Sequence, residues 1–190
     1  MKTLFLLLFL FPSALMASEE YSIEKHFQNP AKLPANITAY LTKEVAPGRI
    51  ASCQEVKPHD LFEAEIVHLN AASKAYLVKP AHMCACSTHY CPMWMFPVKA
   101  KTAKPIWTHP ATHTLEILDK KLSGYRKLKE MGEEPTRGHD SIWSWDRDRY
   151  TEIDNTEWTL DPEKECRLTK QTSQMMDGRM VQHFIKCAQN

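Results

Sequence analysis

The sequence contains little of the material from which cofactor and catalytic loops are usually built. It has only five glycines among its 190 residues, and a phosphate-binding loop needs several glycines close together. Neither the G-x-S-x-G pattern of serine hydrolases nor the H-E-x-x-H pattern of zinc proteases occurs in it. We therefore expect a protein without a cofactor and without enzymatic activity.

The chain also lacks an excess of charge of either sign and a second long apolar run. Without Lys2, 23 basic residues face 23 acidic ones, so nothing in the net charge indicates a nucleic-acid partner. No stretch beyond the N-terminus approaches the ~20 apolar residues of a membrane helix. We expect no membrane span and no binding to nucleic acid.

The N-terminus has the pattern of an export signal. Lys2 supplies a positive charge, Leu4 to Phe11 form a short apolar run, and small residues lead to Ala17. The pattern predicts a signal peptide over residues 1–17 and a periplasmic or secreted protein. We expect an extended arm over residues 18–35 and a single α+β domain over residues 36–190.

The pattern of the remaining chain predicts one helix followed by strands. Asn36 to Ala46 has helical spacing and stops at Pro47-Gly48. Residues 126–135 are rich in charge and predict a connector. Alternating or apolar runs predict the strands of an antiparallel sheet of hairpins, stapled by disulfides, at residues 61–69, 74–79, 93–98, 106–107, 112–118, 141–145, 149–153, 166–168 and 180–187.

All six cysteines follow the predicted signal peptide. An even number in an exported protein favours disulfides over a metal site. Cys166 and Cys187 flank the turn signal Asp177-Gly178 at similar distances, which favours a bridge between them. The pairs we expect are Cys53–Cys84, Cys86–Cys91 and Cys166–Cys187.

A metal site is the alternative interpretation of the central cysteines. Thiolate and imidazole are ligands that copper(I) and zinc accept, and five such side chains lie within ten residues: His82, Cys84, Cys86, His89 and Cys91. Oxidation in an exported protein would consume these thiols, and the spacing is no standard zinc pattern. The remaining histidines are scattered, and we expect each to be a surface or strand-end residue: His68, His109, His113, His139 and His183.

Charge is distributed unevenly along the chain. Residues 99–129 carry eight basic against two acidic side chains, whereas residues 130–165 carry twelve acidic against four basic ones. An acidic, aromatic hairpin in the second segment is suited to a basic partner. The partner-binding residues that we predict are Trp143, Trp145, Asp146, Asp148 and Tyr150.

The order of these signals resembles that in a group of small exported bacterial proteins, some of which inhibit lysozymes or act as periplasmic immunity proteins. The resemblance covers residues 75–153, and this chain has Arg147 to Arg149 where the group more often has glycine. The residues that carry the resemblance are Tyr76, Cys86, Cys91, Trp94, Phe96, Leu115, Ile117, Gly124, Tyr125, Leu128 and the segment Trp145 to Tyr150.

The resemblance implies a non-enzymatic binding protein, an inhibitor of a basic cell-wall hydrolase or an immunity protein against one. The alternative is a periplasmic protein that handles copper or zinc through the loop of residues 82–91.

Overall fold

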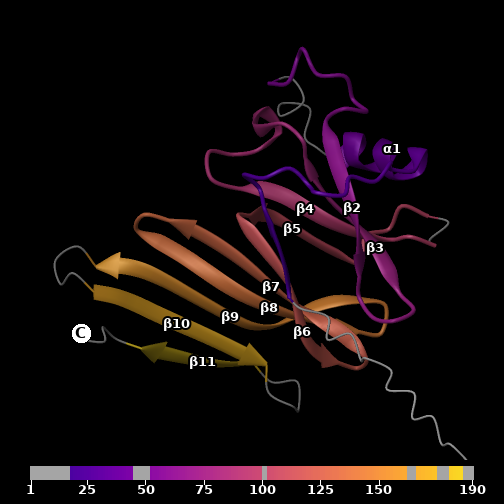
Figure 1. The fold of residues 1–190 in the computed structure, drawn as a ribbon. Helices are drawn as coiled ribbons and strands as arrows, with labels where there is room; N and C mark the ends of the chain where they lie inside the picture. The colour runs from indigo at the N-terminus through magenta and orange to yellow at the C-terminus, as the bar shows by residue number, and fades with distance from the viewer. Residues whose placement is uncertain (1–17, 45–51, 100–101, 162–165, 175–179, 186–190) are drawn as a thin grey trace, which may run out of the picture.

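A computed structural model describes residues 18–44, 52–99, 102–161, 166–174 and 180–185. The predicted signal peptide lies outside these ranges. The described residues form one α-helix, one 3₁₀ turn and eleven strands (Figure 1). Their bounds are β1 Glu19–Ser22, α1 Ala35–Glu44, β2 Phe62–His68, β3 Lys74–Pro80, η1 Met83–Ala85, β4 Cys91–Pro97, β5 Trp107–Thr112, β6 Thr114–Leu122, β7 Tyr125–Glu134, β8 Arg137–Asp146, β9 Arg149–Asp161, β10 Cys166–Gln174 and β11 Met180–Ile185.

The strands form two antiparallel sheets. The larger has the order β1-β6-β7-β8-β9-β10-β11, and the smaller has the order β2-β3-β4-β5. The expected α+β class is therefore wrong, because the described chain is mostly β-structure with one short helix. The helix was predicted over almost the observed residues, but it covers only part of the smaller sheet and does not define a second layer type (Figure 1).

In the described part of the chain, no helix has the length and hydropathy needed to cross a membrane.

The main error of the sequence interpretation concerns β7. The charged residues of this segment suggested a connector, yet ten residues form a strand paired on both sides. Its side chains alternate, with Arg126, Leu128 and Glu130 buried and Lys127 and Lys129 between them only partly exposed. Period-two alternation is the signature of a strand, and the buried charges concealed it.

Apolar side chains of the two sheets meet in a shared core. The smaller sheet contributes Leu77, Met93 and Met95, which are fully buried against Ile117 and Leu128 of the larger sheet. Burying such side chains stabilises the folded state by roughly 1.5–3 kcal/mol each. Trp107 of β5 belongs to the same core and meets Trp143 of β8, which holds β5 over the larger sheet.

Strand β4 is buried on both of its faces. Because side chains alternate across a strand, Met93 and Met95 enter the core between the sheets, whereas Trp94 and Phe96 point to the opposite side. There they join Leu41 of α1 in a second cluster. The continuous apolar sequence of residues 93–98 follows from this double burial.

The N-terminal arm is part of the fold. β1 pairs with β6, and the fully buried Arg126 holds it there through an ion pair with Glu19. The guanidinium also donates hydrogen bonds to the carbonyl oxygens of Ile117 at 2.7 Å and Leu118 at 2.9 Å. The pairing of β1 with β6 and the ion pair of Glu19 would be lost if the arm detached, so the arm is a structural element.

Both predicted hairpins occur in the structure. β8 pairs with β9 around Arg147, which has a positive φ of 56°, and β10 pairs with β11. The turn signal Asp177-Gly178 lies outside the described residues. β8 and β9 extend well beyond the predicted segments, because charged and polar residues continue the ladder to Arg137 and Asp161.

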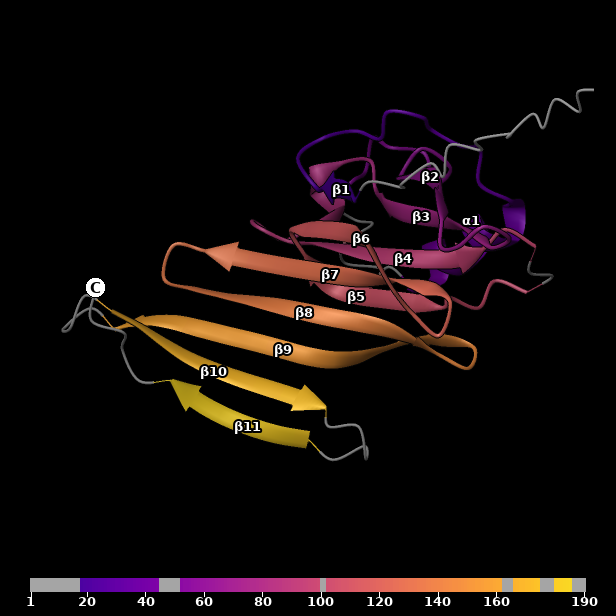
Figure 2. The same cartoon turned by 60° about the horizontal axis from the view of Figure 1, so that its bottom comes forward.

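The larger sheet extends past the smaller one. The smaller sheet covers β6, β7 and β8, whereas β10 and β11 project to one side with nothing drawn over them in either view (Figures 1 and 2). No described element covers the face of these strands that continues the core face, and Leu168 and Phe184 on it are exposed. We call it the open face and define it by the inward residues of β9–β11: Asn155, Glu157, Thr159, Leu168, Lys170, Thr172, Gln182 and Phe184.

Candidate functional site

The predicted partner-binding hairpin separates into two groups of residues. Its acids lie at the tip, where the side chains of Asp146 and Asp148 are 61% and 69% exposed. Asp148 forms an ion pair with Lys104 at 3.4 Å. Asp146 lies 3.9 Å from the exposed Arg147. Such exposed pairs contribute little free energy, so the tip is a solvated turn whose acids have basic neighbours.

The aromatic residues of the same hairpin pack into the molecule. Trp145 stacks on Tyr125 with ring centroids 4.2 Å apart, and Trp143 meets Trp107 edge-on at 6.1 Å. Tyr150 is 4% exposed, and its hydroxyl donates a hydrogen bond to a backbone carbonyl oxygen at 2.9 Å. The structure therefore does not bring the predicted aromatics and acids together on one surface.

The central cysteines are oxidised. Cys53 is bonded to Cys84, and Cys86 to Cys91, as the sequence predicted. Cys166 is also in a disulfide, while Cys187 lies outside the described residues. Disulfide sulfur is a poor metal ligand compared with thiolate, so only His82 and His89 of the predicted soft-metal set keep their donor atoms. Disulfides also agree with an exported protein.

The open face carries a row of neighbouring side chains that crosses four strands. His139 of β8 lies opposite Glu157, which lies opposite Lys170, which lies opposite Phe184 of β11. Lys170 and Glu157 form an ion pair at 3.8 Å. The row begins beneath β5 and ends on the uncovered strands, so it links the covered half of the sheet to the open half.

The end of this row is apolar. The side chain of Phe184 is 70% exposed, and Leu168 is 38% exposed. Together with Trp158 they line a shallow cavity of about 390 Å³. An exposed aromatic ring beside an apolar hollow is characteristic of interaction surfaces.

β11 is the terminal strand of the larger sheet. Among the residues that the structure describes, no strand pairs with its outer edge. Its sequence, MVQHFI, contains neither proline nor a lysine, arginine, aspartate or glutamate. Natural sheets usually protect an edge with such residues, so this edge is unusually suited to pairing with another strand.

Three residues that the sequence interpretation treated separately lie together at the start of the row. Glu130 of β7 is fully buried, and its carboxylate lies between the rings of His109 on β5 and His139 on β8. His139 Nε2 is 2.9 Å from Glu130 Oε2, and His109 Nδ1 is 3.3 Å from Oε1. The sequence interpretation missed the alternation of residues 125–134. Assigning this segment to a strand would have placed Glu130 on the same face as Leu128.

The two histidines determine the ionisation of the carboxylate. Burial alone would raise the pKa of Glu130, but the hydrogen bond from His139 and the positive charge of the neighbouring His109 and His139 outweigh it and lower that pKa below its usual value. The hydrogen bond to Glu130 in turn raises the pKa of His139 above 6.5, against the effect of burial. The cluster therefore favours a negative carboxylate beside a protonated imidazole.

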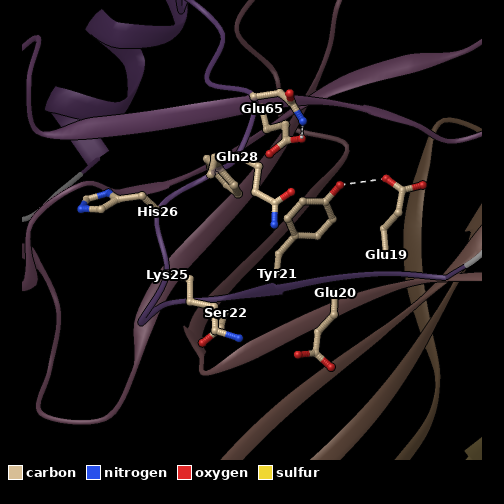
Figure 3. A pocket seen from close by; sticks show the side chains of 10 residues that line it. Glu19, Glu20, Tyr21, Ser22, Lys25, His26, Gln28 and Glu65 are labelled. Carbon is tan, nitrogen blue, oxygen red and sulfur yellow. Dashed lines mark hydrogen bonds between the residues drawn. The ribbon is translucent and has the colours of Figure 1, made fainter.

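A second cavity, of about 360 Å³, lies beside β1 and contains several acids (Figure 3). The hydroxyl of Tyr21 donates a hydrogen bond to Glu19 at 2.8 Å, and Asn29 donates one to Glu65 at 3.2 Å. Burial and the hydrogen bond to Glu19 raise the pKa of Tyr21, which keeps the phenol protonated. Since the first contact lies within β1 and the second fastens the following segment to β2, we assign the cavity a structural role.

Comparison with protein-family models, with curated proteins and with solved structures finds no match to this chain. The comparisons therefore give no support to the resemblance to lysozyme inhibitors and immunity proteins. The functional argument depends on the residues themselves.

Proposed function

We propose that this is an exported protein that binds an extended segment of a partner protein by adding it as a strand to β11. The observation that carries the proposal is the unprotected edge of β11 next to the exposed ring of Phe184. Strand addition uses backbone hydrogen bonds for affinity and pockets for alternate side chains for specificity. The edge of β11 offers backbone groups for such hydrogen bonds, and the cavity beside it offers a pocket for a side chain.

The apolar cavity of the open face supplies the side-chain pocket. Phe184 lies on the edge strand, where an apolar side chain of an added strand would contact it, and Leu168 lies on the same face one strand further in. Fully burying a side chain such as Phe184 contributes roughly 1.5–3 kcal/mol. The ion pair of Glu157 and Lys170 lies beside the pocket and offers one charge of each sign to the partner.

The acidic hairpin tip is the second candidate binding surface. Asp146 and Asp148 are both well exposed, and this tip is the part of the predicted hairpin that remains available to a basic partner such as a cell-wall hydrolase. Charge complementarity of this kind mainly increases the association rate and weakens as salt rises. Salt therefore distinguishes the two surfaces: binding at the tip should weaken as salt rises, whereas strand addition at β11 should not depend on salt in this way.

The test is site-specific crosslinking followed by a binding measurement. A photo-reactive residue at position 182 of the exported protein captures the partner at β11, and mass spectrometry identifies it. Calorimetry on the purified pair then compares the parent with Phe184→Lys. We expect affinity to fall at least about tenfold, because each 1.4 kcal/mol lost corresponds to a factor of ten.

Matched variants separate the two surfaces. Leu122→Lys places the same charge on another exposed apolar residue, 48% exposed, and should leave the affinity unchanged. If the crosslinked species is a second copy of this chain, β11 is still the binding edge and the partner is identified. Unchanged affinity in Phe184→Lys, with a salt-dependent loss in Asp146→Lys combined with Asp148→Lys, would refute strand addition and favour the hairpin tip.

A further inference from the structure

Side chains with metal-ligand chemistry converge at one point between the two sheets. One nitrogen of His109, one carboxylate oxygen of Glu130 and one nitrogen of His139 all lie within 4.8 Å of one another. We propose that these three residues bind a divalent transition-metal ion, with zinc as the first candidate. This site is separate from the β11 edge, and the proposal does not depend on the proposed function.

The donor set suits such an ion. Two imidazoles and one carboxylate are among the ligand sets that zinc accepts, and imidazole also suits copper, iron and nickel. In a tetrahedral site with bonds of about 2.1 Å, ligand atoms lie roughly 3.4 Å apart. His139 Nε2 lies 2.9 Å from Glu130 Oε2 and His109 Nδ1 lies 3.3 Å from Oε1, and one ligand atom from each of the three residues lies within 4.8 Å of the others, so small side-chain shifts would bring them to that spacing.

One ligand atom lacks a hydrogen-bond partner. Glu130 is fully buried, and its Oε1 accepts no hydrogen bond in the structure. His109 approaches this oxygen without the geometry of a hydrogen bond, and a buried polar atom left in this state costs about 1–3 kcal/mol. A metal ion at the point of convergence would coordinate this oxygen and remove the cost.

Packing holds the two rings in place. His109 stacks on Trp107 at 6.3 Å and 17°, and Trp143 meets it edge-on at 6.1 Å. The rings of His109 and His139 are 5.7 Å apart. His109 Nδ1 also forms a hydrogen bond with Thr112 Oγ1 at 3.2 Å, which orients the ring. Rings fixed by neighbours lose little freedom on binding an ion.

The site is also accessible. The side chains of His109 and His139 are 19% and 23% exposed, although Glu130 is not exposed at all. Three protein ligands leave a fourth position of a tetrahedral ion for water or another molecule. His109 belongs to the smaller sheet, whereas Glu130 and His139 belong to the larger one. A bound ion would therefore crosslink the two sheets.

Zinc binding by the tag-free protein tests the proposal. Residues 18–190 are freed of metal with a chelator and titrated with Zn²⁺ by calorimetry at about pH 7.5, where ligands exchange protons for metal. We expect one zinc per chain, X-ray absorption that shows nitrogen and oxygen ligands including imidazole, and a higher melting temperature with zinc. His109→Ala, His139→Ala and Glu130→Gln should each weaken binding by more than the 10–100-fold typical of a lost outer-shell partner.

Two controls keep the test decisive. His113→Ala removes a histidine whose side chain is 32% exposed and which lies outside the cluster, and its zinc affinity should equal that of the parent. Circular dichroism in the presence of chelator identifies any variant that fails to fold. If an alanine variant fails to fold, Glu130→Gln, which preserves the shape of the side chain, provides the test. No stoichiometric zinc binding by the parent, or equal losses in His113→Ala and the cluster variants, would overturn the proposal.

Discussion

The imidazole of His139 occupies the space directly above Gly132. A Cβ atom at position 132 would lie closer to the ring carbon Cε1 of His139 than van der Waals radii permit, and the ring of Tyr90 would be only 3.0 Å away. Gly132 and His139 are opposite each other on β7 and β8. The position of the imidazole beside Glu130 therefore depends on the lack of a side chain at residue 132.

Gly132→Ala should displace His139 and weaken zinc binding without unfolding the protein. The expected loss of zinc affinity is about tenfold, at the lower end of the range for a misplaced outer-shell contact, and calorimetry measures it. Gly138→Ala is the matched control, because a Cβ there would meet the indole of Trp158 at 2.7 Å and not His139. Equal zinc affinity in both variants would contradict this role of Gly132.

The stability of the metal-free protein should depend on pH through the same cluster. The lowered pKa of Glu130 contributes stability that is present above pH 4.5 and is lost as the pH falls through the folded value. The raised pKa of His139 contributes stability that is complete below pH 6.5 and is lost as the pH rises through the folded value. Asp140 and Glu157 also raise the pKa of His139.

Between pH 4.5 and pH 6.5, the contributions of Glu130 and His139 to stability are both fully present. In chelator, the difference in unfolding free energy between the parent and Glu130→Gln should be largest there and should shrink toward lower and higher pH. Urea unfolding across the pH range measures that difference. A difference that is constant with pH would show that the cluster does not ionise as described.

The two placed disulfides should differ in their contribution to stability. Chain-entropy estimates give about 3.7 kcal/mol for Cys53–Cys84, whose sequence separation is 31, and about 2 kcal/mol for Cys86–Cys91, whose sequence separation is 5. Paired serine substitutions, followed by denaturant unfolding, compare the two losses. The reverse order of losses would contradict the estimate, and thiol titration of the unreduced parent should find no free thiol.

Tyr150→Phe should affect stability and leave partner binding unchanged. The hydroxyl of Tyr150 donates a hydrogen bond to the backbone carbonyl oxygen of Arg126 at 2.9 Å inside the core. Removing it leaves that oxygen without this donor, which costs about 1 kcal/mol. Thermal unfolding measures the loss. A reduced affinity for the crosslinked partner in this variant would restore Tyr150 to the binding surface.

The sequence predicted local features better than it predicted the layers. The helix near residue 36, the hairpin around Arg147 and the pairs Cys53–Cys84 and Cys86–Cys91 follow from turn chemistry, spacing and composition, and the structure contains them. The two-sheet arrangement does not follow from such signals, because pairing between β1 and β6 joins residues almost a hundred positions apart.

The charge cluster was missed for a related reason. Glu130 was assigned to a charged connector, because charged residues are rarely buried without partners. Its partners, His109 and His139, lie on two other strands, and only the tertiary structure brings them together. A sequence pattern records period and composition, and it contains no information about which strand lies opposite another across a core.

Strand β4 has a consequence for how the molecule unfolds. Its side chains belong alternately to the core between the sheets and to the cluster beneath α1. Neither cluster can be fully exposed to solvent while β4 stays in place, and unfolding of β4 disrupts the packing of both clusters. The helix and the two sheets should therefore melt in one cooperative transition, so amide hydrogens of α1 and of β6 that exchange only by global opening will report the same free energy.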